Sequence, residues 1–167
     1  SAEDQETNNP EVTTFAGSSA GSSDGTGTSA SFNEPTGIAS DGTNLYVVDQ
    51  SNHRIRKIVI STGVVTTLAG SGSRSFANGT GTSASFNMPA EVTTDGTNLY
   101  VTDSYNHRIR KIVISTGVVT TLAGSSEGFA DGTGTSASFN QPNGIITDGT
   151  NLYVADRINH RIRKIVI

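Results

Sequence analysis

One stretch of 20 residues occurs three times in this chain, and it constrains the fold more than any other feature. It reads Asp-Gly-Thr-Asn-Leu-Tyr-Val-x-Asp-x-x-Asn-His-Arg-Ile-Arg-Lys-Ile-Val-Ile, and its copies begin at Asp41, Asp95 and Asp148. The copies are therefore spaced 54 and 53 residues apart. A fixed period of this size is typical of repeat architectures, in which each repeat is one supersecondary unit.

The pattern within one repeat predicts four short antiparallel strands. Tight turns separate them at Asp41-Gly42, where glycine tolerates a positive φ, and at Ser61-Thr-Gly63. Four antiparallel strands joined in this way form one blade of a β-propeller, so we expect an all-β propeller fold. In the first repeat the expected strands are a (37–40), b (44–49), c (53–60) and d (64–69).

Composition agrees with this fold class and excludes several others. Only 33% of the 167 residues are hydrophobic, while Gly, Ser and Thr are abundant, which suits short strands and turns better than helices. The chain has no cysteine, so disulfides and thiol chemistry are excluded. No apolar run approaches the length of a membrane span, so we expect no membrane partner. A formal charge of −4 argues against a general polyanion binder.

The repeats also set the expected domain boundaries. Residues 1–10 are polar and acidic, which predicts a flexible tail, and a start at Ser1 without Met suggests a mature or trimmed product. Residues 11–17 repeat the sequence of strand d and are expected to form a closure strand. The half-propeller then spans 11–167, with blade 1 at 35–70, blade 2 at 89–124 and strands a–c of blade 3 at 142–167.

These residues resemble a known family. The run Tyr-Val-x-Asp-x-x-Asn-His-Arg-Ile-Arg-Lys, preceded by Phe-Asn-x-Pro, looks like the NHL repeat, in the bacterial subtype with Asp-Gly-Thr-Gly-Thr-Ser-Ala-Ser-Phe-Asn between blades. The resemblance covers nearly everything after residue 11. It implies a β-propeller, most often of six blades, and favours a secreted or cell-surface bacterial origin.

Strand counting predicts how the chain assembles. Propellers have about 4 to 8 blades, so three blades cannot form a flat closed ring. Two copies related by a twofold axis give six blades, with the strand at 12–16 of each copy pairing with strand c at 161–167 of the other. The expected partner is therefore a second copy, in a homodimer with swapped closure strands. The residues expected at this assembly are Val12, Phe15, Ile162, Ile165 and Ile167.

Three recurring polar features could indicate chemistry, but each has a structural explanation. The histidines His53, His107 and His160 lie in different blades, too far apart for one zinc ion, so each is expected to tie its own b–c turn, with the Asp four residues earlier as a candidate partner. The Arg-x-Arg-Lys runs alternate across a strand, which does not favour nucleic acid as a partner. The loop at Asp24, with Asn78 and Asp131 as counterparts, lacks the regular acidic ligands of a calcium loop.

We therefore expect a non-enzymatic scaffold with no cofactor, no metal and no catalytic residue. A lyase or esterase of the propeller type with a metal on its axis is an alternative. Such a metal would need acidic or His side chains from the three strands a, and the sequences of these strands contain only one, Glu91. An RNA-binding NHL module and a fragment of a longer bacterial surface repeat array are further alternatives. A designed or trimmed origin also fits the near-identity of the copies.

Differences between the copies indicate where a protein, peptide or other ligand is expected to bind. They collect in the b–c loops and the d–a crossovers, which emerge on one side of a propeller disc; we call this side the crossover face. Loops tolerate change more than strands, which explains part of this pattern. The residues predicted for binding are Tyr105, Arg157, Met88, Glu91, Gln50, Glu34, Asn143 and Gln141.

Overall fold

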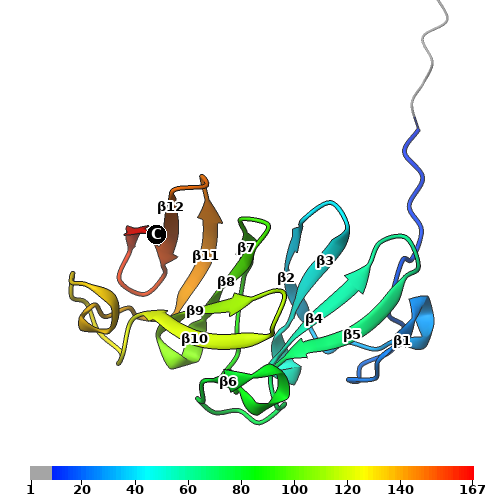
Figure 1. Cartoon of the computed structure of the whole chain (residues 1–167), viewed down its shortest axis with the longest axis horizontal. Helices are drawn as coiled ribbons and strands as arrows, with labels where there is room; N and C mark the ends of the chain where they lie inside the picture. Colours follow the sequence, from blue (N-terminus) through cyan, green and yellow to red (C-terminus); the bar gives the residue numbers. More distant parts are fainter. Residues whose placement is uncertain (1–8) are drawn as a thin grey trace, which may run out of the picture.

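A computed structural model describes residues 9–167 and consists of short antiparallel strands with single 3-10 turns (Figure 1). Most of the predicted acidic tail, residues 1–8, lies outside the described residues. The strands are β1 (Gly25–Thr26), β2 (Pro35–Ser40), β3 (Asn44–Asp49), β4 (Arg54–Val59), β5 (Val64–Ala69), β6 (Gly79–Thr80), β7 (Val92–Thr94), β8 (Asn98–Asp103), β9 (Arg108–Val113), β10 (Val118–Ala123), β11 (Pro142–Thr147), β12 (Asn151–Asp156) and β13 (Arg161–Val166). The 3-10 turns are Gly27–Ser29, Gln50–Asn52, Gly81–Ser83, Ser104–Asn106 and Gly134–Ser136.

Residues 9–167 contain no α-helix, and no helix among them has the length and apolar character needed to cross a lipid bilayer. The all-β, antiparallel expectation is thus confirmed for this part of the chain.

The strands form three sheets, one for each expected blade. Blade 1 has the order β5-β4-β3-β2, blade 2 has β10-β9-β8-β7, and the described part of blade 3 has β13-β12-β11. Strands a, b, c and d therefore pair in the predicted order. The short strands β1 and β6 were not predicted; they come from the crossover loops and pair with the outer edges of β5 and β10. They cover two sheet edges that would otherwise be open.

The turns that join strands a and b follow from the sequence Asp-Gly-Thr-Asn. The Asp41 carboxylate accepts hydrogen bonds from the backbone N–H groups of Thr43 and Asn44, at 2.9 and 2.7 Å. Gly42 lies at φ +88°, a conformation that L side chains rarely adopt. Asp41 also accepts a hydrogen bond from the hydroxyl of Tyr46, which anchors the turn to strand β3.

Each blade packs its two faces against its neighbours. We call the face toward the preceding blade the leading face and the face toward the following blade the trailing face. The trailing face of blade 1 packs on the leading face of blade 2, through Tyr46, Val48, Ile55, Ala69, Phe86, Val92, Leu99, Val101, Ile112 and Val119. Blades 2 and 3 pack in the same way, through Tyr100, Ile109, Ala123, Phe139, Ile145, Leu152 and Val154.

Some boundaries differ from the prediction. Strand c begins at Arg54 rather than at His53, because His53 takes a left-handed conformation with φ 53° that a strand cannot include. Strand a of blade 2 begins at Val92 rather than at residue 91.

The predicted closure strand at 11–17 is irregular in the single chain, where residues 9–19 form no strand. Figure 1 shows this N-terminal segment and the C-terminus at opposite ends of the molecule, so the segment does not lie against β13 of its own chain.

Candidate functional site

The two kinds of variable loop lie side by side on the crossover face, as predicted. In each blade a backbone hydrogen bond joins the b–c loop to the d–a crossover: Ser51 N–H donates to Asn33, Tyr105 to Asn87 and Ile158 to Asn140, each at 3.1 Å. Because these bonds recur, residues 34, 88 and 141 lie beside residues 50–51, 104–105 and 157–158 of the same blade.

Side-chain contacts place most of the predicted binding residues in this region. The Ser51 hydroxyl donates to the Glu34 carboxylate, and the Arg157 guanidinium donates to the Gln141 side chain. Tyr105 is 41% exposed, and the guanidinium of Arg74 lies 5.6 Å from its ring centroid. These contacts leave polar and aromatic groups accessible on the outer part of the crossover face.

Of the remaining predicted residues, Met88 donates its backbone N–H to His53, and the other three lie toward the inner strands. Gln50 donates to the carbonyl of Pro89 in the next blade at 3.2 Å, and the Asn143 carbonyl accepts from Thr102 at 2.6 Å. Half-buried Glu91 accepts from the N–H of Val92 at 3.0 Å. The structure therefore spreads the eight predicted side chains over three blades and does not gather them at one point.

Buried ion pairs account for the recurring arginines. Arg56, which is fully buried, donates to Asp49 and to Asp24, both at 2.9 Å. Arg110 donates to Asp103 at 2.6 Å and to the side chain of Asn78 at 3.0 Å. Arg163 repeats the pattern in blade 3, with Asp156 and Asp131. These arginines therefore donate to side chains of their own blades and of the crossover loops that precede those blades.

The same contacts give Asp24, Asn78 and Asp131 a structural role, since each accepts from the arginine of its blade. Burial raises the pKa of the Asp103 carboxyl above its ordinary value, and the Arg110 guanidinium acts in the opposite direction. The sequence showed that Asp residues were available to the arginines, but not which arginine nitrogen each would accept from.

Each histidine closes its own b–c turn, as expected, because its backbone N–H donates to the carbonyl of residue 50, 104 or 157. The side chains of His53 and His107 differ from the expectation, since they join their blade to the next one rather than pairing with the Asp four residues earlier. Nδ1 of His53 accepts from the backbone N–H of Met88 at 3.0 Å, and Nδ1 of His107 accepts from that of Gln141 at 3.1 Å. Burial, together with the charge of Arg74, lowers the pKa of His53 below its ordinary value. Among the described residues, no three His, Asp or Glu side chains are grouped closely enough to hold a metal ion.

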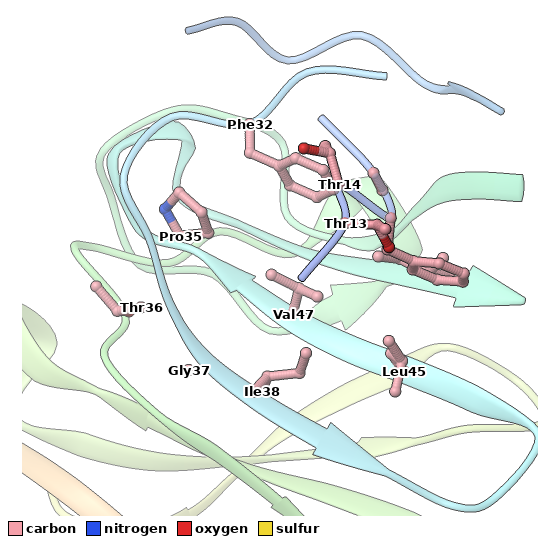
Figure 2. Close-up of a pocket in the computed structure, with 12 residues that line it drawn as sticks. Thr13, Thr14, Phe32, Pro35, Thr36, Gly37, Ile38, Leu45 and Val47 are labelled. Atoms are coloured by element: carbon pink, nitrogen blue, oxygen red, sulfur yellow. The ribbon is translucent and has the colours of Figure 1, made fainter. Parts of the chain in front are cut away.

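The leading face of blade 1 is open and hollow (Figure 2). The hollow has a volume of about 470 Å³, and Figure 2 shows Phe32, Ile38, Leu45 and Val47 along it, with the segment at Thr13 and Thr14 on its rim. Ile38 is 59% exposed, whereas its counterparts Val92 and Ile145 are buried against the preceding blade. Alternate-residue apolar patterning could have identified Ile38, because Val92 and Ile145 occupy the same place in their repeats.

The trailing face of blade 3 is open as well. A hollow of about 350 Å³ there is lined by Ile146, Tyr153, Ala155 and Ile162 among others. Ile162, a predicted assembly residue, is 74% exposed, while its counterparts Ile55 and Ile109 are fully buried.

The other predicted assembly residues have different surroundings. Val12 is 93% exposed, and Phe15 and Ile167 are partly exposed. Ile165 is not at the open trailing face, because it packs on the opposite side of β13 against the core between blades 2 and 3.

Comparison with known proteins identifies the repeat. The family described as NHL repeat matches residues 32–58 and 86–112. The chain is 37% identical over 150 residues to Protein SUPPRESSOR OF QUENCHING 1, chloroplastic, from Arabidopsis thaliana, covering 81% of this chain and 14% of that protein. It is 32% identical over 152 residues to NHL repeat-containing protein 2 from Gallus gallus, covering 80% of this chain and 21% of that protein. The chain thus spans less than a quarter of these relatives.

Solved structures share the fold. An auxiliary nutrient binding protein from Bacteroides thetaiotaomicron has a TM-score of 0.70 at 27% identity, over 77% of this chain and 36% of that one. One from Bacteroides ovatus has a TM-score of 0.66 at 28% identity, over 75% of this chain and 35% of that one. The third copy in this chain repeats the sequence of the two that match the family. The chain is therefore an NHL-repeat protein.

Proposed function

We propose that the chain is a non-enzymatic scaffold, two copies of which close a six-bladed ring that carries a ligand-binding crossover face. The observation that carries the assembly is the match between the two open faces and the interfaces inside the chain. The open leading face of blade 1 has the same residue pattern as the leading faces that blades 2 and 3 bury. The open trailing face of blade 3 likewise has the pattern that blades 1 and 2 bury.

The proposed number of blades in the ring follows from the three blades that each chain contributes. A ring made of whole copies has a multiple of three blades, and six is the multiple that falls within the range of about 4 to 8. The contact joins the trailing face of one copy to the leading face of the other, so it occurs twice and leaves neither face open. Covering a large aliphatic side chain contributes about 1.5–3 kcal/mol, which favours closure.

The histidine contacts support the same arrangement. His160 is exposed in the single chain, whereas its counterpart His53 is buried against Met88. In the proposed ring, Nδ1 of His160 accepts from the N–H of Glu34 of the second copy, because Glu34 occupies the position of Met88 in its repeat and has the same left-handed backbone.

A charge placed on the open trailing face tests the ring. Ile146 is 64% exposed there, while its counterpart Thr93 is buried. We expect Ile146→Asp to sediment as one chain and the wild type as two, because the ring would bury the new carboxylate. Val118→Asp is the matched control, since Val118 is 37% exposed on the outer rim of blade 2 and should leave the assembly unchanged. A wild type that sediments as a single chain would overturn the ring.

The crossover face is the proposed ligand site, because the loops that differ between blades meet there and present Tyr105 and Arg157. Tyr and Arg are enriched where proteins bind partners. Two of the solved structures with this fold are described as auxiliary nutrient binding proteins, which points to a small nutrient as the ligand class. In a twofold ring the face would present each of these side chains twice.

A thermal-shift screen with monosaccharides, oligosaccharides, amino acids and short peptides tests the ligand site. A compound that stabilises the wild type should lose at least 10-fold in affinity for Tyr105→Ala and Arg157→Ala. It should bind unchanged to Ser115→Ala, which alters an exposed turn on the opposite face. Equal binding to all four proteins would dismiss the crossover face as the site.

A further inference from the structure

Both complete blades hold their outermost strand in a slot. In blade 1, β5 lies between β4 on one side and the Gly25–Thr26 pair of β1 on the other. In blade 2, β10 lies in the same way between β9 and the Gly79–Thr80 pair of β6. The slot is therefore bounded by strand c and by a Gly-Thr pair from the preceding crossover loop.

Blade 3 has the same slot. A hollow of about 500 Å³ lies between β13, at Arg163–Val166, and the loop at Asp131–Gly134, which carries the corresponding Gly132-Thr133 pair. Its apolar lining includes Ala137, Phe139 and Ile165. The counterparts of these residues in blade 2, which are Ala84, Phe86 and Ile112, pack around Val119 of β10.

We infer that this slot is a β-strand acceptor site and that its ligand is the segment Glu11–Ala16 of a second copy. The inference rests on the proposed ring and specifies how the ring is joined. Residues 11–17 have the sequence pattern of β5 and β10, and Val12 corresponds to Val65 and Val119. Val65 and Val119 are buried in their slots, whereas Val12 is 93% exposed in the single chain. Pairing by main-chain hydrogen bonds with alternate side chains in pockets is the general mode of strand addition.

The C-terminal end of the donor segment is held in the same way as the end of a strand d. The N–H of Gly17 donates to the Gly27 carbonyl at 3.1 Å, as Gly70 does to Gly81 and Gly124 to Gly134. Ala16 packs on the core of its own blade 1 beside Phe32, as its counterpart Ala69 packs on the core around Phe86. The Ala16–Gly17 end of the segment therefore stands in the place of the last residues of a strand d that precedes blade 1.

The register follows from the complete blades. In blade 1, Val65 lies opposite Ile58, Thr66 opposite Lys57, Thr67 opposite Arg56 and Ala69 opposite Ile55. The same register places Val12, Thr13, Thr14 and Ala16 opposite the partner copy's residues 165, 164, 163 and 162. The Thr14 hydroxyl should then donate to the carboxylate at position 131 of the other copy, because Thr67 donates to Asp24 within blade 1.

Two matched substitutions, each of which introduces a negative charge into the donor segment, test the slot. Val12 and Thr13 are both exposed in the single chain, so Asp at either position should leave the fold of the chain intact. In the slot, position 12 is buried like Val65, while position 13 faces solvent like Thr66. We expect Val12→Asp to raise the dissociation constant of the dimer by about 100-fold or more, and Thr13→Asp to change it by less than about 3-fold. Equal effects of the two substitutions would overturn the inference.

A disulfide tests the register. Paired residues of antiparallel strands have Cα atoms about 4.5–5.5 Å apart, which suits a disulfide, and the chain has no cysteine of its own. The variant with Thr13→Cys and Lys164→Cys should form a covalent dimer under mild oxidation. The control with Thr13→Cys and Arg161→Cys, three residues out of register, should not.

A labelled peptide of residues 9–17 separates failure of the slot from failure of the ring. It should bind to Val12→Asp chains, whose slots are intact, and the same peptide with Asp in place of Val should not. A wild-type dimer in which the first cysteine pair does not cross-link and the peptide does not bind would overturn the slot while the ring stands. A wild-type monomer that binds the peptide would overturn the ring while the slot stands.

Discussion

Nδ1 of His53 accepts a hydrogen bond from the backbone N–H of Met88, 3.0 Å away, and so joins blade 1 to blade 2. His107 and Gln141 repeat this contact between blades 2 and 3. The acceptor is the neutral imidazole, because a protonated ring nitrogen has no lone pair to offer. The contact between blades therefore depends on the protonation state of His53.

The stability of the chain should fall as the pH is lowered because of His53. Its folded pKa is lowered from 6.5 by burial and by Arg74, so its contribution is fully present above pH 6.5 and is lost as the pH falls through the folded pKa. A lost hydrogen bond of this kind costs about 1 kcal/mol. Urea unfolding at pH 7 and pH 5 should show a smaller pH effect in His53→Gln than in the wild type. An identical pH effect in the two proteins would contradict this role.

Breaking one buried ion pair should lower the free energy of unfolding much more than removing an arginine at the rim. Arg110→Met leaves the Asp103 carboxylate buried without its 2.6 Å partner, which should lower the free energy of unfolding by about 3–5 kcal/mol. Arg108→Met is the matched control, since it removes a guanidinium 4.0 Å from the Phe76 ring centroid and should cost about 1 kcal/mol. Chemical denaturation measures the free energy of unfolding of both variants. Equal losses would contradict a larger contribution of the buried pair to the stability of the blade.

Tyr46 should make the chain sensitive to alkali. Burial and the hydrogen bond to Asp41 raise its pKa from 10.0 to about 12. Because the folded pKa is raised, the contribution of the neutral phenol is present below pH 10 and is lost as the pH rises toward 12, by about 2–3 kcal/mol at most. Unfolding measured at pH 9 and pH 11.5 should show a smaller loss in Tyr46→Phe, and a loss equal to that of the wild type would refute the assignment.

Gly37 should be intolerant of a side chain. A Cβ there would lie 2.6 Å from Oε1 of Glu91, 2.8 Å from its Cα and 2.9 Å from the carbonyl oxygen of Ala90. Overpacking of this kind costs about 1–3 kcal/mol, so Gly37→Ala should destabilise the contact between blades 1 and 2 by that amount in urea. Unchanged stability would show that the inner strands separate easily.

Gly144 offers the corresponding test of assembly. Among the atoms of residues 9–167, a Cβ at Gly144 would meet only Ala155 Cβ, at an ordinary 3.6 Å. Within one chain, Gly37 of blade 1 lies close to Glu91 of blade 2. In the proposed ring, Gly144 of blade 3 would lie equally close to Gly37 of the second copy. Gly144→Ala should therefore raise the dissociation constant of the dimer by about 10-fold or more while the blades stay folded. An unchanged dissociation constant would contradict this packing of the inner strands.

Features set by short stretches of sequence could be predicted well. Strand d at Val64–Ala69 has the predicted bounds, because Ser61-Thr-Gly63 and Gly70 fix both of its ends. The adjacency of the two variable loops on one face follows from up-and-down connectivity alone. The pairing order of strands a to d follows from the same connectivity.

Features that depend on the placement of one blade against another could not be predicted in this way. Nδ1 of His53 accepts from the backbone N–H of Met88, 35 residues later. The carboxylate of Asp49, the partner expected for His53, instead accepts from Arg56 and Asn52. The pairing of Gly25–Thr26 with β5 was missed because a two-residue strand has no apolar pattern of its own. The open faces become visible only when Ile38 and Ile162 are compared with their buried counterparts.

The mass of the unmodified chain in solution tests the central claim most directly. Sedimentation equilibrium at micromolar concentration should give a single species of twice the 17.3 kDa chain mass, as expected of three blades joined to three. A single species of 17.3 kDa, or a series of larger species that grows with concentration, would contradict the closed six-bladed ring.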